Sequence, residues 1–256
     1  MTMTGLAALG SSAFAAGPPA AQPVIELRQY KILKGRRDAM IALFEREFVD
    51  SQEALGIRII GQFRDLDDPD RFTWIREFES MAARATALNA FYFGPLWKAH
   101  RDEANALLDD NDNVLLLHPA VAGLGFGPLT RPVMAGGPAG LVIATIHYLW
   151  KDAGEGFGSF FQERMQPALA AAGLPVLSAY VPEREPNNFP RLPVRQSEKL
   201  FVWFTRVPDA AAYDAAMVRL RADKLWHATT GAALDDFEER AAQILRLAPA
   251  SRSTLR

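Results

Sequence analysis

Three landmarks of this chain recur at one constant spacing of 129 residues, and this recurrence constrains the fold more than any other feature. The landmarks are Phe72–Trp74 with Phe201–Trp203, Ser80 with Asp209, and Trp97 with Trp226. Agreement of three separate spacings within 256 residues is hard to obtain by chance. The recurrence therefore predicts that the chain is a tandem of two domains of one kind, each large enough to bury its own core.

The first half has the residue pattern of alternating strands and helices. The alternation of apolar and polar residues from position 24 to 33 predicts a half-buried strand, and Met40, Phe44 and Phe48 at steps of four predict an amphipathic helix. Two more strands follow at 57–66 and 71–79, a long helical region starts at the N-cap residue Ser80, and a last strand covers 112–120. This order is β-α-β-β-α-β, the ferredoxin-like motif.

The second half repeats this order from residue 141 onward, with one clear difference. Tyr148 lies 118 residues after Tyr30, whereas the landmarks beyond the second strand are 129 apart. The second hairpin therefore carries about 11 extra residues, around 186–196. Such a loop serves either in recognition or as an extension that locks the halves together.

The predicted fold class is α+β, with two tandem ferredoxin-like domains whose antiparallel sheets pack face to face as an α/β barrel. A four-stranded sheet with helices on one face must cover its other face, and a sister sheet does this. The predicted domains are 23–121 and 141–250, with a Gly- and Pro-rich linker at 122–140 and a tail at 251–256.

Residues 1–22 form a leader that does not resemble the rest of the chain. Ala13–Ala15 has the small-x-small form of a signal-peptidase site, but the positively charged region that precedes it in signal peptides is missing. Two readings stay open. Either the leader is a truncated signal peptide and the protein is exported, or it is a disordered segment of a cytoplasmic protein.

Composition excludes several classes of function. The chain has no cysteine, which excludes disulfides, thiolate nucleophiles and cysteine-bound metal clusters. The net charge of −2 gives no global field to attract nucleic acid. No other stretch approaches the roughly 20 continuous apolar residues of a membrane helix.

The first half resembles the NIPSNAP family. Glu26, Leu27, Arg28 and Tyr30 match the ELRxY opening of that family, and the order of the following elements agrees up to Leu117–Pro119. The second half departs from the pattern, since the Glu and Arg are lost around Ile146–Tyr148. The resemblance implies a dimeric α/β-barrel fold made by two chains or two tandem domains, with an undefined activity. The wider superfamily includes cofactor-free monooxygenases and haem-degrading enzymes.

Glu26, Arg28 and Tyr30 form the most prominent group of candidate site residues. The period of a strand places all three on one face, where a guanidinium and a phenol lie side by side. One interpretation is a patch that binds a small acidic or carbonyl ligand, with Tyr30 as a catalytic candidate. The other, which we favour, is a structural network between the facing sheets. Arg76 on the third strand suits either role.

His100 and Trp97 share one face of the second helical region. The resemblance to haem-degrading enzymes makes His100 a candidate iron ligand, although no local motif supports it, and a surface histidine is the simpler interpretation. The repeated tryptophans, Trp97 included, are either core residues or the lining of an apolar pocket. No cofactor or metal is predicted, with haem as the alternative.

Three functional hypotheses remain at this stage. The first is a NIPSNAP-type protein that binds a small molecule or a protein partner through a barrel pocket. The second is a cofactor-independent monooxygenase or haem-binding oxygenase that depends on Tyr30 or His100. The third is a structural assembly module. The barrel is expected to close within one chain, and further dimerisation is compatible with each hypothesis.

Overall fold

The computed structural model describes residues 22–131 and 140–256, and its centre is a closed antiparallel barrel of eight strands. The strands follow one another around the barrel in the order β1 (Val24–Ile32), β3 (Arg71–Phe78), β2 (Arg58–Asp65), β9 (Glu238–Pro249), β6 (Leu141–Leu149), β8 (Leu200–Val207), β7 (Val176–Pro182) and β5 (Val114–Pro119), which pairs with β1 again. A short strand, β4 (Leu108–Asp110), adds to the end of β1. The leader, 1–21, and part of the expected linker, 132–139, lie outside the described residues.

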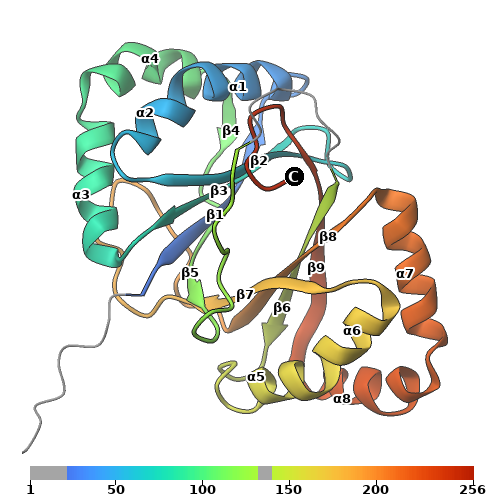
Figure 1. The fold of residues 1–256 in the computed structure, drawn as a ribbon. Helices are drawn as coiled ribbons and strands as arrows, with labels where there is room; N and C mark the ends of the chain where they lie inside the picture. Colours follow the sequence, from blue (N-terminus) through green and yellow to red (C-terminus); the bar gives the residue numbers. More distant parts are fainter. Residues whose placement is uncertain (1–21, 132–139) are drawn as a thin grey trace, which may run out of the picture.

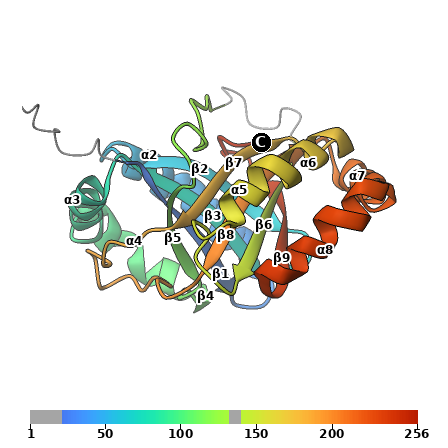
Figure 2. The same cartoon turned by 90° about the horizontal axis from the view of Figure 1, so that it is seen from below.

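Helices cover the outside of the barrel in two groups, one from each half of the chain (Figures 1 and 2). The first group comprises α1 (Arg37–Leu43), the π-helical turn η1 (Phe44–Phe48), α2 (Val49–Glu53), α3 (Met81–Tyr92) and α4 (Pro95–Asn105). The second comprises α5 (Phe157–Phe160), η2 (Phe161–Met165), α6 (Gln166–Ala172), α7 (Ala210–Ala222), η3 (Trp226–Gly231) and α8 (Ala232–Phe237). No helix in the described parts of the chain is long and apolar enough to cross a bilayer.

The two sets of four strands join edge to edge at two seams. At one seam Phe63–Asp65 of β2 pair with Leu247–Pro249 of β9, and at the other Leu117–Pro119 of β5 pair with Tyr180–Pro182 of β7. Hydrogen bonds thus continue across both junctions, so the strands form one closed sheet rather than two sheets that only face each other. The closed barrel has no free edge at these seams.

The barrel has one apolar core inside and two outside. Ile25 and Leu27 of β1 point inward and join the interior cluster with residues such as Phe204 and Leu247. The alternate positions Val24 and Ile32 point outward and pack under the first group of helices. This division follows from the two-residue period of a strand. The second group of helices encloses a separate outer cluster around Phe161 and Trp203.

Local signals in the sequence account for several element boundaries. Ser80 and Asp209 are confirmed as N-caps, because their side chains accept hydrogen bonds from the backbone N–H of Ala83 (3.1 Å) and Ala212 (2.8 Å). Gly56 has φ +80°, which suits the residue that ends the first helical segment. The segment 251–256, expected to be a tail, packs onto β2, with Leu255 buried inside the barrel.

The alignment of Tyr30 with Tyr148 was wrong by one residue. Arg28 lies opposite Trp74 and Thr145 lies opposite Trp203, so the position that matches Tyr30 is His147. Tyr148 points into the barrel, whereas Tyr30 points toward the helices. The π-helical turns η1 and η2 are also 117 residues apart, whereas the landmarks after the hairpin are 129 apart. The hairpin extension is therefore 12 residues long rather than 11.

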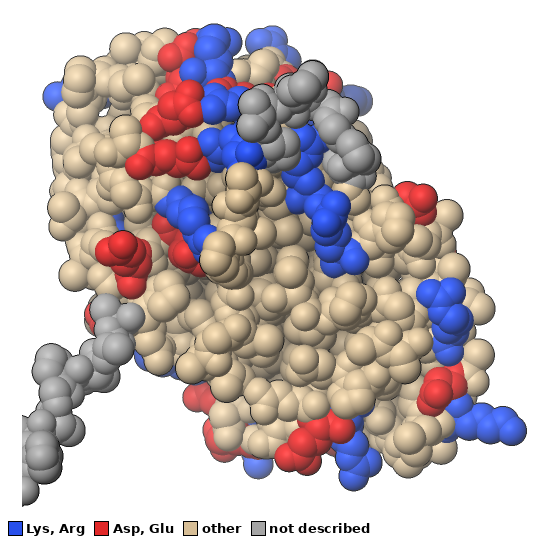
Figure 3. Space-filling model, viewed as in Figure 1, with Lys and Arg blue, Asp and Glu red and all other residues tan. Residues whose placement is uncertain are grey.

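Charged side chains of both signs are mixed on the face shown in Figure 3, around a wide uncharged area. This face therefore has no patch of a single sign. Nucleic acid binding would need a continuous basic surface, and this side of the molecule does not offer one.

Candidate functional site

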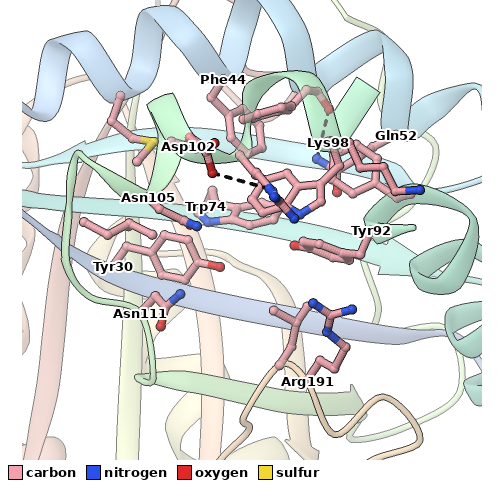
Figure 4. A pocket seen from close by; sticks show the side chains of 18 of the residues that line it. Tyr30, Phe44, Gln52, Trp74, Tyr92, Lys98, Asp102, Asn105, Asn111 and Arg191 are labelled. Carbon is pink, nitrogen blue, oxygen red and sulfur yellow. Dashed lines mark hydrogen bonds and ion pairs between the residues drawn. The ribbon is translucent and has the colours of Figure 1, made fainter. Parts of the chain in front are cut away.

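A cavity of about 410 Å³ lies outside the barrel, between the sheet and the first group of helices (Figure 4). Its lining side chains are mainly aromatic and apolar: Tyr30, Met40, Phe44, Phe48, Phe72, Trp74, Phe91, Tyr92, Phe93, Trp97, Ala104, Leu108, Phe189 and Leu192. The polar residues of the lining are Gln52, Lys98, Arg101, Asp102, Asn105, Asn111 and Arg191. Ligand pockets have typical volumes of about 300–1,000 Å³ and walls of this apolar kind.

Four aromatic residues of the cavity lining carry polar groups: Tyr30, Trp74, Tyr92 and Trp97. The rings of Tyr30 and Trp74 meet edge to face, with centroids 5.8 Å apart. The hydroxyl groups of Tyr30 and Tyr92 point toward one another across the cavity (Figure 4). Phe44 packs against Trp74 from the π-helical turn, at 4.7 Å between centroids. A π-helical turn is a frequent device at functional sites, and here it brings Phe44 and Phe48 to the same cavity.

Behind this aromatic layer lies a fully buried cluster of three arginines around one glutamate. The Glu26 carboxylate accepts hydrogen bonds from Arg28 Nη1 (2.5 Å), Arg76 Nε (2.7 Å) and Arg84 Nε (2.7 Å). All four side chains are 0% exposed. No second carboxylate bonds to the cluster from the described residues, so it carries two positive charges in excess. A buried charge without a partner lowers the free energy of unfolding, so this imbalance calls for an explanation.

The pKa values of Glu26 and Arg84 follow from burial and from these contacts. Burial by itself raises the pKa of Glu26, but Arg76, Arg28 and Arg84 together outweigh it and hold that pKa far below its usual range. Burial lowers the pKa of Arg84, since the attraction of Glu26 is opposed by Arg76 and Arg28. Glu26 is therefore ionised, and one carboxylate does not satisfy all three guanidiniums.

Gln52 connects the cluster to the cavity. Its side-chain N–H₂ donates to the carbonyl oxygen of Phe48 (2.9 Å), and its Oε1 accepts from Arg76 Nη1 (2.9 Å). Both ends of the amide are thus fixed, and the side chain is 1% exposed. The π-helical turn that ends at Phe48 and the arginine cluster are held in one hydrogen-bonded unit.

Two buried hydrogen-bond donors of the cavity lining have no acceptor within the described part of the protein. Trp74 Nε1 is buried and unpartnered. The Tyr30 hydroxyl accepts from Arg28 Nε at 2.7 Å, which leaves its own proton free to donate. Burial raises the pKa of Tyr30 to about 12 against the lowering effect of Arg28, so the phenol stays protonated at neutral pH. Buried polar groups without partners are rare and call for an explanation.

The hairpin extension of the second half forms one wall of this first-half cavity. Phe189 stacks near Tyr92 at 5.6 Å, and Arg191 and Leu192 also line the cavity. The loop is anchored to the charged cluster, because Asn187 Oδ1 (3.1 Å) and Asn188 Oδ1 (2.7 Å) both accept from Arg84 Nη1. The loop between β7 and β8 thus contributes to the site in addition to extending the hairpin.

The residues proposed from the sequence occupy different places. Tyr30 and Trp97 line the cavity, whereas Glu26, Arg28 and Arg76 lie behind its floor. The network of Glu26 and Arg28 that we placed between the facing sheets lies instead on the outer face, under the helices, because Val24, Glu26, Arg28 and Tyr30 share the outward positions of β1.

His100 does not line the cavity; its side chain lies between α4 and η1, beside Glu47 and Phe48. Its side chain is 28% exposed, and its Nε2 is 3.3 Å from Glu47 Oε2. No histidine is present among the described residues that line the cavity. The residues at the cavity therefore do not suit a haem iron held by His100.

Sequence reasoning missed Arg84, Gln52, Asn187 and Asn188 as parts of the site. Arg84 carried a signal, because it lies on the same face of α3 as the buried Leu88 and Phe91, where a charged residue is unexpected. The two asparagines lie in the extended loop, for which recognition was one of the predicted roles, but their contacts with Arg84 arise only in the folded chain.

The second half has neither the cluster nor an unpartnered indole at the matched positions. Ile143, Thr145 and Thr205 take the places of Glu26, Arg28 and Arg76 in the strand register. His147 takes the place of Tyr30, and its Nε2 accepts from Trp203 Nε1 at 3.0 Å, while its Nδ1 donates to Glu238 at 2.6 Å. The indole that is unpartnered in the first half is satisfied in the second.

Comparison with known proteins finds a family match for the first half and similar folds for nearly the whole chain. The NIPSNAP family model matches residues 25–121, which confirms the resemblance found in the sequence. No curated protein matches the chain. Among solved structures, a proposed monooxygenase from Fusobacterium nucleatum is 11% identical with a TM-score of 0.59, covering 90% of this chain and 93% of its own.

Two further solved structures cover nearly the whole chain. A proposed monooxygenase from Lactobacillus acidophilus is 14% identical with a TM-score of 0.56, covering 90% of this chain and 97% of its own. An anthrone oxidase-like protein is 11% identical with a TM-score of 0.54, covering 90% and 92%. At such identities the likeness concerns the fold alone. Residues 25–121 thus match the NIPSNAP family, and the second half of the chain completes the barrel to which they belong.

Proposed function

We propose that the cavity of the NIPSNAP half binds a small molecule with a flat, mainly apolar body. The observation that carries this proposal is an aromatic cavity of about 410 Å³ whose lining includes Trp74, a residue with a buried N–H that has no acceptor among the described residues. A ligand oxygen would satisfy this donor together with the free proton of Tyr30. Apolar walls with a few convergent polar groups are typical of small-molecule sites.

The second half supports a role in binding rather than in folding. There the matched tryptophan, Trp203, donates to His147, and the outer core is closed around it. A barrel half of this kind thus packs well without an unpartnered indole or a charged cluster. The cost of burying these groups in the first half points to selection for a ligand.

We further propose that the chain consists of two ferredoxin-like units, 23–121 and 141–250, joined by 122–140. Support comes from the same order of strands and helices in both halves, from π-helical turns 117 residues apart, and from tryptophans 129 residues apart. In this proposal the second unit keeps the architecture and supplies the loop that forms one wall of the cavity in the first unit.

The test is to fill the cavity and measure the binding of a neutral aromatic probe. Prodan, an uncharged naphthalene dye, is expected to gain fluorescence with the wild-type protein. Ala104→Phe, at a buried position of the lining, should abolish this gain. Ala153→Phe fills a smaller hollow in the second half and serves as the matched control. Equal dye binding by wild type and Ala104→Phe would refute the proposal.

A second candidate function is cofactor-independent oxidation in the same cavity. The observation that favours it is the similarity in fold to proposed monooxygenases and to an anthrone oxidase-like protein over nine-tenths of the chain. The test is oxygen uptake with anthrone, whose CH₂ group reacts with O₂ to give the quinone carbonyl and water. Uptake that Tyr30→Phe abolishes supports this candidate, and uptake equal to that of buffer alone rejects it for this substrate.

A further inference from the structure

The buried arginine cluster indicates the charge of the ligand. Three guanidiniums face one carboxylate, and all four side chains are shielded from water. Coulomb repulsion between buried like charges is strong because the surrounding dielectric is low. The strand register of the second half has Ile143, Thr145 and Thr205 at the matching positions, so the barrel does not depend on this cluster. A second anion next to the cluster would remove part of the imbalance.

The positive charge reaches the cavity through a thin aromatic layer. The guanidinium carbon of Arg28 lies 5.1 Å from the ring centroid of Tyr30 and 5.4 Å from that of Trp74. Arg76 lies 5.0 Å from the Trp74 ring and 5.9 Å from that of Tyr92. These three rings are also part of the cavity lining. Only the thickness of one aromatic ring therefore separates a ligand that contacts these rings from the guanidinium groups of the cluster.

The two free donors lie in this same layer. The Arg28 guanidinium donates to the Tyr30 oxygen, and this polarises the phenol so that its own proton becomes a better donor. Trp74 Nε1–H is the second donor, 2% exposed as a residue and without an acceptor in the described ranges. Both groups can only donate in this arrangement, so they select an acceptor such as a carboxylate or phenolate oxygen.

The outer part of the cavity has the same sign. Lys98, Arg101 and Arg191 line it, with Asp102 as the one carboxylate in the lining. Asp102 is 3.3 Å from Arg101, its neighbour in sequence, while the guanidinium of Arg191 stacks on Phe93 at 4.9 Å. An anion therefore meets positive potential from the entrance to the floor.

We propose that the ligand of this cavity is an aromatic monoanion whose carboxylate or phenolate oxygen accepts from Tyr30 and Trp74 and offsets the excess charge of the cluster. This inference rests on the proposed binding function and adds the chemical class of the ligand. The aromatic walls contact the ring system, and the charged layer selects the anion over its neutral analogue. A charge-assisted hydrogen bond is about twice as strong as a neutral one.

The experiment compares two probes of the same shape, 2-naphthoate and 2-naphthamide, by isothermal titration calorimetry at about pH 7, where the acid is ionised. The wild-type protein should bind naphthoate at least about tenfold more tightly than naphthamide, as expected for charge-assisted donors at a buried site. Equal affinity would overturn the charge assignment and leave the binding function intact. Binding of neither probe would overturn both.

Variants locate the source of the selectivity. Arg28→Leu reduces the excess charge and should bring the naphthoate-to-naphthamide ratio close to one while naphthamide still binds. Tyr30→Phe removes one donor without a change in charge and should weaken naphthoate by about tenfold, which provides a second readout if Arg28→Leu fails to fold. Thr145→Val, at the position that matches Arg28, is the control and should leave both affinities unchanged. A selectivity that survives both Arg28→Leu and Tyr30→Phe would contradict the proposal.

Discussion

Trp74 and Trp203 occupy matching places in the two halves of the barrel, yet their indole groups have opposite surroundings. Trp203 Nε1 donates to His147, which in turn donates to Glu238. Trp74 Nε1 has no acceptor among the described residues, and the residue lines a cavity. The comparison teaches that a barrel half of this kind can satisfy its central tryptophan internally. The first half leaves it open and adds a charged cluster behind it.

The largest difference between the halves is the buried charge, and Glu26→Gln tests it. Without its carboxylate the cluster holds three guanidiniums and no counter-charge, so the free energy of unfolding should fall by about 3–5 kcal/mol. The matched change Ile143→Val should cost only about 0.5–1.5 kcal/mol. Urea denaturation measures both. Equal losses at the two sites would show that the cluster contributes no more than ordinary core packing.

The same variant gives a pH dependence whose sign follows from the lowered pKa of Glu26. A carboxylate with a lowered pKa in the folded state stabilises the protein fully above its ordinary value of 4.5 and loses that contribution as the pH falls further. The difference in unfolding free energy between wild type and Glu26→Gln should therefore be constant near neutral pH and shrink below about pH 4.5. A difference that grows in acid would contradict the assignment.

A smaller effect is expected where the second half contacts the first. Asn188→Ala removes an acceptor of Arg84 and a donor to the Met81 carbonyl oxygen (2.6 Å), and should cost about 1–3 kcal/mol. Hydrogen exchange of residues 186–196 should rise at the same time. The control is Arg184→Gln, in the same loop between β7 and β8. It breaks an exposed ion pair with Asp152 and should change the stability little. Unchanged exchange in Asn188→Ala would mean that the loop is held by other contacts.

Substitution of the two tryptophans should have opposite consequences: at Trp203 it should lower the stability, and at Trp74 it should lower the affinity for naphthoate. Trp203→Phe breaks a buried hydrogen bond and leaves His147 Nε2 without its donor, whereas Trp74→Phe breaks none. Trp203→Phe should therefore cost about 1–2 kcal/mol more in thermal or urea unfolding. Trp74→Phe should instead weaken naphthoate, which Trp203→Phe leaves unaffected. If the two variants lose the same stability and the same affinity, the contrast between the halves fails.

The smallest effect is expected at His100. Its partner Glu47 is partly exposed, and exposed ion pairs contribute less than about 1 kcal/mol. His100→Ala should leave both the stability and the binding of naphthoate close to wild type. A large loss of binding would place His100 in the site after all and would revive the haem alternative.

Local patterns predicted much of the fold. The caps Ser80 and Asp209, the strand at Val24–Ile32 and the aromatic helix around Phe44 were all readable, since each depends on residues close in sequence. The alignment of Tyr30 with Tyr148 failed by one residue, because a strand changes face at every position and a tyrosine occurs in each half.

The candidate site was only partly predictable, for a related reason. The period of β1 placed Glu26, Arg28 and Tyr30 on one face, but it could not show which side of the sheet that face meets. Closure of the barrel decides this, and it depends on strand pairs far apart in sequence. The contacts of Asn187 and Asn188 with Arg84 span more than 100 residues, so only the folded chain reveals them.

The two seams of the barrel have a consequence for how the chain folds during synthesis. When the first half leaves the ribosome, β2 and β5 are open edges, and the interior side chains of Ile60 and Phe63 lack the second-half residues, such as Phe204 and Leu247, that complete their core. Open strand edges with exposed apolar residues are sites of aggregation. These strand edges therefore stay unpaired until β7 and β9 have been synthesised.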